Sequence, residues 1–169
     1  MKQQQVAYLG PEGTFGHEAA KMWNPNAIYV PFLSHLHILD AVERGKITQG
    51  IVALENSIDG SVTDVMDFFI HQAARARVCG EIVIRINQCL FAKPGTSLGS
   101  VQLVISHPKA LGQCGRNIHR LFPNAQRMTV DSTAAAVVKM LATDVPAVAI
   151  AGKTAMQPGA VILRENFQD

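Results

Sequence analysis

The sequence is poor in the features that mark secreted, membrane-spanning and nucleic-acid-binding proteins. Its 169 residues include only three cysteines, an odd number with no CxxC pair, which predicts reduced thiols rather than disulfides. The sequence has no apolar run of ~18 residues for a membrane span, and its first residues lack the apolar core of a signal peptide. A net charge of +2 is too small for a nucleic-acid footprint. We therefore expect a cytoplasmic protein with no membrane or nucleic-acid partner.

Signals for metals and nucleotide cofactors are also missing. The histidines, cysteines and carboxylates form no cluster with the spacing of metal ligands. His35 and His37 stand two apart on a predicted helix, so their side chains do not face each other. The glycines at 10, 13 and 16 match neither the dinucleotide fingerprint nor the Walker loop. The sequence predicts neither a metal nor a cofactor.

What the sequence does contain is a regular alternation of short apolar runs and amphipathic segments, with 48% hydrophobic residues to build a core. This alternation predicts an α/β fold, either one domain or two small lobes. Strands are expected at 6–9, 27–30, 50–57, 101–105, 126–130, 147–151 and 160–163. Helices are expected at 18–23, 36–42, 62–72, 108–121 and from 131 or 132 to 141.

One long extended segment breaks this alternation. Residues 78–91 contain no helical pattern, and their apolar and polar residues alternate around residue 84. We interpret this segment as a hinge between two lobes. The first lobe would comprise about residues 1–76 together with the C-terminal strand region, and the second about residues 77–158.

The most informative stretch runs from Gly50 to Val62. Its apolar residues predict a buried strand that ends in Glu55, Asn56 and Ser57, and polar groups at the carboxyl end of a strand face the ligand crevice in open α/β sheets. The alternative is an ordinary strand followed by a capped helix, with Ser61 as N-cap and Asp64 as its partner. Both interpretations stay open at this point. If the crevice exists, Glu55 is the acidic side chain placed for proton transfer.

Other predicted strands end in the same way, with a hydroxyl beside the start of a helix. These hydroxyls belong to Thr14, Ser106, Ser132 and Thr133. Each alone is typical of a helix cap. Together they predict a polar crevice lined by the positive ends of helices, which suits a small ligand that carries a carboxylate.

Four segments then make the chain resemble the prephenate dehydratase family. They are residues 8–15 (YLGPEGTF), 55–62 (ENSIDGSV), 106–114 (SHPKALGQC) and 131–135 (DSTAA). The resemblance implies two α/β lobes similar to type II periplasmic binding proteins, with prephenate in the cleft between the lobes, and a homodimer. The substrate-binding residues that it implies are Thr14, Asn56, Ser57, Ser106, Ala110, Leu111, Ser132 and Thr133.

The chain also departs from the family pattern. Gln88 and Lys109 replace a histidine and a glutamine that are usual there, and the sequence contains neither the Thr-Arg-Phe motif nor the regulatory ACT domain. The motif threonine is thought to assist departure of the ring hydroxyl. Its absence favours a cofactor-independent, non-aromatising prephenate decarboxylase of secondary metabolism that gives dihydro-4-hydroxyphenylpyruvate, with Glu55 or His107 as proton donor.

Two alternatives remain. The first is a prephenate dehydratase that forms phenylpyruvate, carbon dioxide and water, and it gains weight if the sequence is part of a longer chain. The second is a non-catalytic module that binds small acids. In the enzymatic interpretations, Asn56→Ala and Ser106→Ala are each expected to weaken activity without unfolding the protein.

Overall fold

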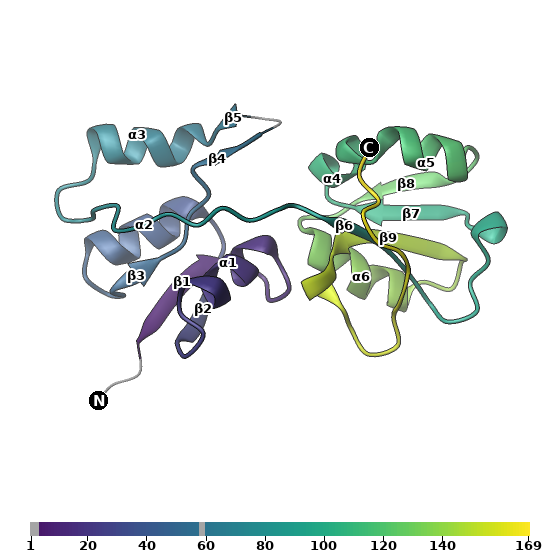
Figure 1. The fold of residues 1–169 in the computed structure, drawn as a ribbon, viewed down its shortest axis with the longest axis horizontal. Coiled ribbons are helices and arrows are strands. Elements are labelled where there is room, and N and C mark those ends of the chain that lie inside the picture. Colours follow the sequence, from purple (N-terminus) through teal and green to yellow (C-terminus); the bar gives the residue numbers. More distant parts are fainter. Residues whose placement is uncertain (1–3, 58–59) are drawn as a thin grey trace. The chain divides into compact units, whose positions relative to one another are not determined.

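A computed structural model describes residues 4–57 and 60–169, so Ile58 and Asp59 of the 55–62 segment lie outside the described residues. The chain folds as two compact units, which we name unit 1 (Met1–Ile84) and unit 2 (Arg85–Asp169). Unit 1 contains β1 (Gln5–Leu9), α1 (Phe15–Trp23), β2 (Ile28–Phe32), α2 (His35–Glu43), β3 (Gln49–Gly50), β4 (Glu55–Asn56), β5 (Gly60–Ser61) and α3 (Thr63–His71). Unit 2 contains β6 (Gln88–Ala92), β7 (Leu103–Ser106), α4 (Pro108–Gln113), α5 (Gly115–Leu121), β8 (Gln126–Thr129), α6 (Thr133–Ala142), β9 (Ala147–Gly152) and β10 (Val161–Arg164), with short 3-10 turns at Leu98–Ser100 and Lys153–Ala155 (Figure 1).

Unit 1 is built on a small parallel sheet in the order β2-β1-β3. Successive side chains of a strand point to opposite faces, and β1 is buried on both. Val6 and Tyr8 pack with Ala20 of α1, whereas Ala7 packs with Ile38 of α2. The two helices therefore cover opposite faces of the sheet, and α3 packs beside α2.

The predicted strand over 50–57 is much shorter in the structure. Only Gln49 and Gly50 pair with β1, and one further hydrogen bond joins the Ile51 amide to the Ala7 carbonyl. The chain then leaves the sheet, with the Leu54 side chain 47% exposed, and β4 pairs with β5 as a separate antiparallel hairpin. The apolar run is a misleading signal because a strand requires a partner strand, and the pairing with β1 ends at Ala7 and Gly50 although β1 itself continues to Leu9.

The predicted Ser61–Asp64 capping box is also absent from the structure. Ser61 belongs to β5, where it pairs with Glu55, and the N-cap of α3 is Val62, which makes no side-chain capping bond. Because Ser61 pairs with Glu55 in the hairpin, the N-cap of α3 is one residue later than predicted, at Val62.

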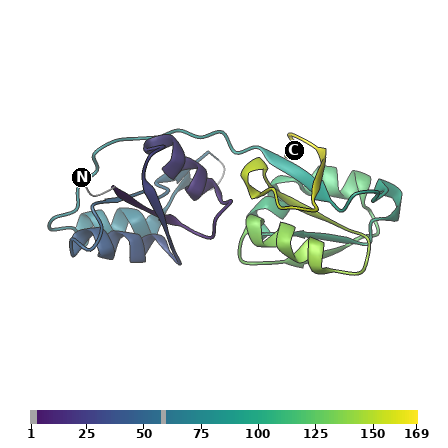
Figure 2. The same ribbon diagram turned by 90° about the horizontal axis from the view of Figure 1, so that it is seen from below.

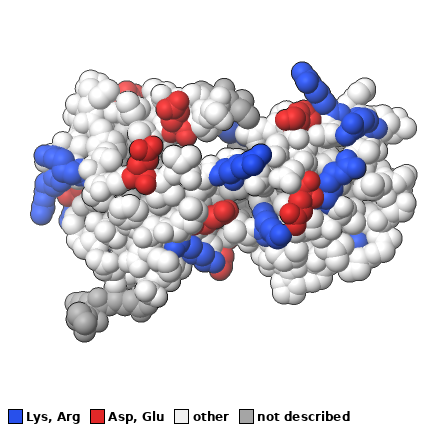
Figure 3. All heavy atoms as spheres, viewed as in Figure 1, with Lys and Arg blue, Asp and Glu red and all other residues white. Residues whose placement is uncertain are grey.

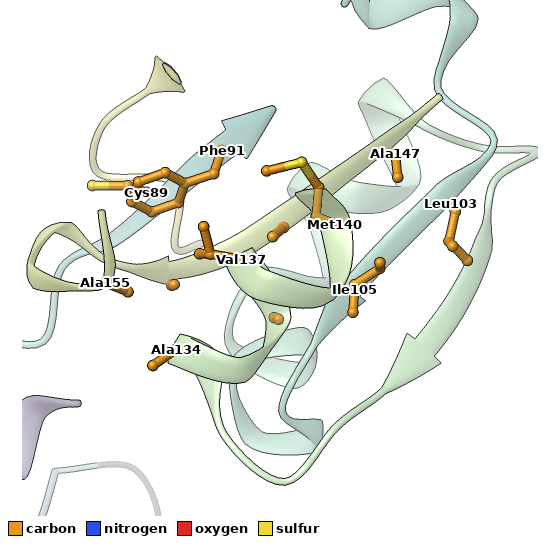
Figure 4. Packing of buried hydrophobic residues seen from close by; sticks show 12 residues of the cluster. Cys89, Phe91, Leu103, Ile105, Ala134, Val137, Met140, Ala147 and Ala155 are labelled. Atoms are coloured by element: carbon orange, nitrogen blue, oxygen red, sulfur yellow. The ribbon is translucent and has the colours of Figure 1, made fainter. Parts of the chain in front are cut away.

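Unit 2 is a five-stranded mixed sheet in the order β10-β6-β9-β7-β8. Strands β7, β8 and β9 are parallel, β6 runs antiparallel to β9, and β10 runs antiparallel to β6. Helix α6 covers one face of the sheet, and α4 and α5 cover the other (Figures 1 and 2). In Figure 4, Val137 and Met140 of α6 point towards Phe91 and Ile105 of the strands, which explains why this face is fully buried.

Two features of unit 2 differ from the sequence-based interpretation. The single helix expected over 108–121 is two helices that meet at Cys114.

The C-terminal strand region, assigned above to the first lobe, lies in unit 2: β10 pairs with β6, and Phe167 is fully buried in the core under α4 and α5. The boundary between the units falls at residues 84 and 85, inside the extended segment, rather than at 76 and 77. Long-range pairing and burial of an aromatic ring decide this placement, and local sequence carries no signal for either.

The described residues include no helix long and apolar enough to span a bilayer. On the face drawn in Figure 3, basic and acidic side chains are interspersed. This pattern agrees with the small net charge of +2.

Candidate functional site

The best-defined group of predicted site residues lies at the carboxyl ends of β7 and β8 in the unit 2 sheet. Because β7 and β8 are parallel and Ser106 pairs with Thr129, the segments that follow these strands lie side by side. The Val130 amide donates to the Ser106 carbonyl at 3.1 Å and holds the two ends together. A shallow hollow of about 260 Å³ opens at this edge, lined by His107, Pro108, Thr129, Val130 and Asp131. We call it the β7–β8 hollow.

Helix α6 begins beside this hollow. Its N-cap is Ser132, whose hydroxyl oxygen accepts from the Ala135 amide at 3.0 Å, and Thr133 is the first helical residue. The first helical bond runs from the Ala136 amide to the Ser132 carbonyl, so the amides of Thr133 and Ala134 precede the helical ladder. The partial positive charge of a helix N-terminus attracts carboxylates. This end of α6 can therefore bind an acidic ligand.

His107 provides the start of α4. Its Nδ1 accepts from the Lys109 amide at 3.3 Å, so the half-buried ring itself serves as the N-cap. A neutral imidazole that accepts at Nδ1 carries its proton on Nε2, where it can be donated to a ligand. The ring is thus both fixed by the backbone and equipped with one hydrogen-bond donor.

Ser106, Ala110 and Leu111 lie beneath this edge rather than on it. The Ser106 side chain is fully buried, and its hydroxyl donates to the Ile150 carbonyl of β9 at 2.6 Å. Ala110 and Leu111 pack in the core under α4 and α5. All three side chains belong to the packed interior, and their assignment to substrate contact stays a prediction that rests on the resemblance.

Thr14 occupies the corresponding position in unit 1, after β1 and before α1. Its hydroxyl donates to the Leu9 carbonyl at 2.8 Å and accepts from the His17 amide at 3.3 Å. Positions 13 and 16, on either side of Thr14, require glycine, because Gly13 in the preceding loop has a φ of +85° and a Cβ on Gly16 of α1 would lie 2.9 Å from the Leu9 carbonyl oxygen. The glycines allow α1 to begin directly against the end of β1.

Glu55, Asn56 and Ser57 lie elsewhere in unit 1, on and after the β4 strand of the hairpin. Glu55 and Ser57 are exposed, and Asn56 is half-buried. The structure therefore presents a carboxylate on a short hairpin instead of at the end of a buried strand. The prediction that Glu55 transfers a proton remains open for this placement, because an exposed carboxylate is accessible to a ligand.

Sequence reasoning missed two histidines of unit 1. His17 is only 4% exposed and packs between Tyr8 and Tyr29. The Nε2 of His35 accepts from the Ala53 amide at 3.5 Å, and burial, opposed by the charge of Asp64, lowers the pKa of His35. The sequence was examined only for a metal site at His35 and His37. The position of His35, directly after the serine N-cap of α2, was the signal that its side chain could reach the loop that contains Ala53.

A second hollow of unit 2, of about 250 Å³, is lined by Arg116, Asn117, Arg120 and Asp169. Here the Asp169 carboxylate accepts from the Arg116 and Asn117 amides at 2.8 and 2.9 Å. The chain's own carboxylate thus occupies the N-terminus of α5. Among residues 4–57 and 60–169, no group of three His, Cys, Asp or Glu side chains is placed to hold a metal ion.

Parallel strands that end in hydroxyls beside helix N-termini are typical of α/β proteins that bind small ligands at the carboxyl ends of their strands. The sequence model of prephenate dehydratase matches residues 6–169, and the chain belongs to that family. This result confirms the resemblance found in the sequence.

Individual relatives give the same result. The chain is 34% identical over 98% of its length to a bifunctional chorismate mutase/prephenate dehydratase of Stutzerimonas stutzeri, and covers 45% of that protein. It is 34% identical over 98% of its length to arogenate dehydratase 1 of Petunia hybrida, and covers 39% of it. The crystal structure of prephenate dehydratase in complex with L-Phe from Arthrobacter aurescens matches 98% of this chain at a TM-score of 0.87 and 29% identity; the match covers 56% of that chain. The predicted two-lobed α/β fold class is therefore confirmed, and the chain spans less than half the length of these curated relatives.

Proposed function

We propose that this chain catalyses the dehydratase reaction on prephenate, forming phenylpyruvate, carbon dioxide and water. The observation that carries the proposal is the family match across residues 6–169. The β7–β8 hollow supports it, because a helix N-terminus and a histidine whose Nδ1 accepts a backbone bond lie beside that hollow and suit a carboxylate ligand.

We assign one carboxylate of prephenate to the N-terminus of α6, where the Thr133 and Ala134 amides and the Thr133 hydroxyl are the donors. When the ring carboxylate leaves as carbon dioxide, the electron pair of the broken C–C bond enters the ring. The ring then expels its hydroxyl group, which takes up a proton and leaves as water, and the ring becomes aromatic. A general acid at that hydroxyl contributes typically ~10²- to 10⁴-fold in rate. The Nε2 proton of His107, which lines the same hollow, is our candidate for this acid, and Glu55 of unit 1 stays the alternative that the sequence predicts.

The comparisons favour this reaction over the non-aromatising decarboxylation expected from the sequence. That expectation rested on segments missing after residue 169, and the chain spans less than half the length of its curated relatives, so their absence is no argument. The substitution at Gln88 carries little weight either, because this side chain is buried and its amide donates to Gln113 at 3.2 Å. Its amide oxygen is buried and has no hydrogen-bond partner among the described residues.

The test is to incubate the protein with prephenate and to identify the products by ultraviolet absorbance and NMR, with arogenate as a second substrate. Stoichiometric phenylpyruvate is the expected result. Dihydro-4-hydroxyphenylpyruvate would replace the proposal with the decarboxylase. Thermal stabilisation by prephenate without any product would identify a binding module.

Two matched variants locate the activity at the β7–β8 hollow. Thr133→Ala removes the hydroxyl at the N-terminus of α6 and is expected to raise KM for prephenate about tenfold, the effect of one hydrogen bond to a charged group. Thr143→Ala changes the same residue type at the opposite end of α6 and should leave KM unchanged. Equal KM values for the two variants would show that the Thr133 hydroxyl does not bind the carboxylate.

A further inference from the structure

His17 is a buried histidine that the proposed reaction does not use. It is the third residue of α1, and its side chain is 4% exposed. The ring stacks on Tyr8 of β1 with centroids 4.8 Å apart and meets Tyr29 of β2 edge-on at 5.5 Å. A histidine held between two tyrosines has a fixed orientation, so its ring nitrogens face defined neighbours.

One of these nitrogens binds the loop that precedes α1. The Gly13 amide donates to Nδ1 of His17 at 3.2 Å. The next residue, Thr14, accepts from the His17 amide and donates to the Leu9 carbonyl. Loop 10–14 is therefore attached to His17 twice, once through its ring and once through its backbone, and these contacts contribute to the position of the Thr14 hydroxyl.

The ring can make the Gly13 contact only while it is neutral. With Nδ1 as acceptor, the single proton of the imidazole is on Nε2. A second proton would sit on Nδ1 and point at the Gly13 N–H, which replaces a hydrogen bond with two opposed donors. Burial is the main cause that lowers the pKa of His17, the charge of Lys21 lowers it further, and the charge of Glu12 acts in the opposite direction. The remaining titratable groups against the ring are Tyr8 and Tyr29, and burial, followed by the charge of Glu12, raises the pKa of Tyr8.

We propose that His17 is a positioning residue whose neutral ring holds loop 10–14 and with it the hydroxyl of Thr14, a predicted substrate-binding residue, and that protonation of the ring releases the loop. The inference rests on the proposed function for its kinetic consequence. Its structural half, the bond between Gly13 and the ring, is independent of any substrate. The closing experiment measures the two halves separately.

Three variants of the full chain distinguish this role from simple packing. His17→Asn keeps an acceptor near the position of Nδ1 that does not titrate, His17→Phe keeps an aromatic ring without the acceptor, and His119→Asn changes an exposed histidine of unit 2. We expect kcat/KM of the wild type to fall as the pH is lowered from 8 to 5 through the pKa of His17. His17→Asn should stay within about threefold of the wild type at pH 8 and lose the His17-dependent part of this fall. His17→Phe should lose about tenfold at pH 8, mainly in KM, and His119→Asn should match the wild type.

NMR of the ring nitrogens and of the Gly13 amide supplies the readout that needs no turnover. The expected result is a neutral Nε2–H tautomer at pH 7 and a Gly13 amide that shifts with the titration of His17 and moves in His17→Phe. A proton on Nδ1 at pH 7, or an acid limb identical in wild type and His17→Asn, would overturn the proposal. If prephenate is not turned over, the proposed function fails, and the Gly13 and ring signals still decide whether His17 holds the loop.

Discussion

Replacing Ser106 by alanine is expected to destabilise unit 2, which revises the expectation from sequence that only activity would suffer. The Ser106 hydroxyl is fully buried and donates to the Ile150 carbonyl of β9 at 2.6 Å. Alanine cannot donate, so the carbonyl oxygen loses this partner in a place that water does not reach. A buried polar group without its partner costs about 1–3 kcal/mol.

This cost translates into a measurable change in Tm. For a chain of this size, 1 kcal/mol corresponds to a shift in Tm of roughly 2–4 °C, so the variant should melt roughly 2–12 °C lower. The single tryptophan, Trp23, lies in unit 1, and its fluorescence is unsuited to following unit 2. Far-UV circular dichroism should be combined with hydrogen exchange of peptides from β7 and β9.

Ser100→Ala is the matched control, because the Ser100 hydroxyl makes a similar bond, to the Ser97 carbonyl, on the surface. Its Tm should stay close to that of the wild type. The reasoning is refuted if Ser106→Ala keeps the wild-type Tm and exchange rates and loses activity on prephenate. That outcome would show that the hydroxyl contacts the substrate, as the resemblance implies.

Two further predictions concern unit 1 and the thiols. The Glu43 carboxylate accepts from the amides of residues 74–76 at 2.8–3.2 Å, and these bonds hold its pKa below the usual 4.5. Its stabilisation is therefore present above pH 4.5 and is lost as the pH falls through the lowered pKa. Glu43→Gln should speed hydrogen exchange at residues 74–76 at pH 7, and unchanged exchange would contradict the assignment. A thiol reagent should modify the exposed Cys79 quickly and Cys89 and Cys114 only after unfolding, since both are buried and burial raises the pKa of Cys114 to about 12; rapid modification of all three in the native protein would contradict the packing of unit 2.

The sequence predicted well those features that depend on neighbouring residues. The caps at Thr14 and Ser132 follow from a hydroxyl placed directly before a helical pattern, and both hydroxyls accept the expected amide bonds. The sequence also predicted that strands end near Ser106 and before Ser132, and in the structure Ser106 pairs with Thr129, the last residue of the neighbouring strand. These inferences need only local preferences and one rule of sheet topology.

Features that depend on distant partners escaped the sequence. Leu54 ends an apolar run that looks like a strand, yet no strand pairs with it in the described structure. The direction of the Ser106 hydroxyl is set by a carbonyl 44 residues away, and the place of Phe167 by a core formed from β6, β7, α4, α5 and β9. The contact between Gly13 and His17 is local, but the sequence of a helix does not predict which nitrogen of a histidine accepts a hydrogen bond.

The central claim is that unit 2 binds a carboxylate of prephenate at the β7–β8 hollow. NMR chemical shifts of the backbone amides, recorded during titration with prephenate, test it most directly. The account predicts saturable shifts at the Thr133 and Ala134 amides and at His107. Shifts confined in unit 2 to Arg116, Arg120 and their neighbours in the second hollow, with no change at Thr133, would contradict it.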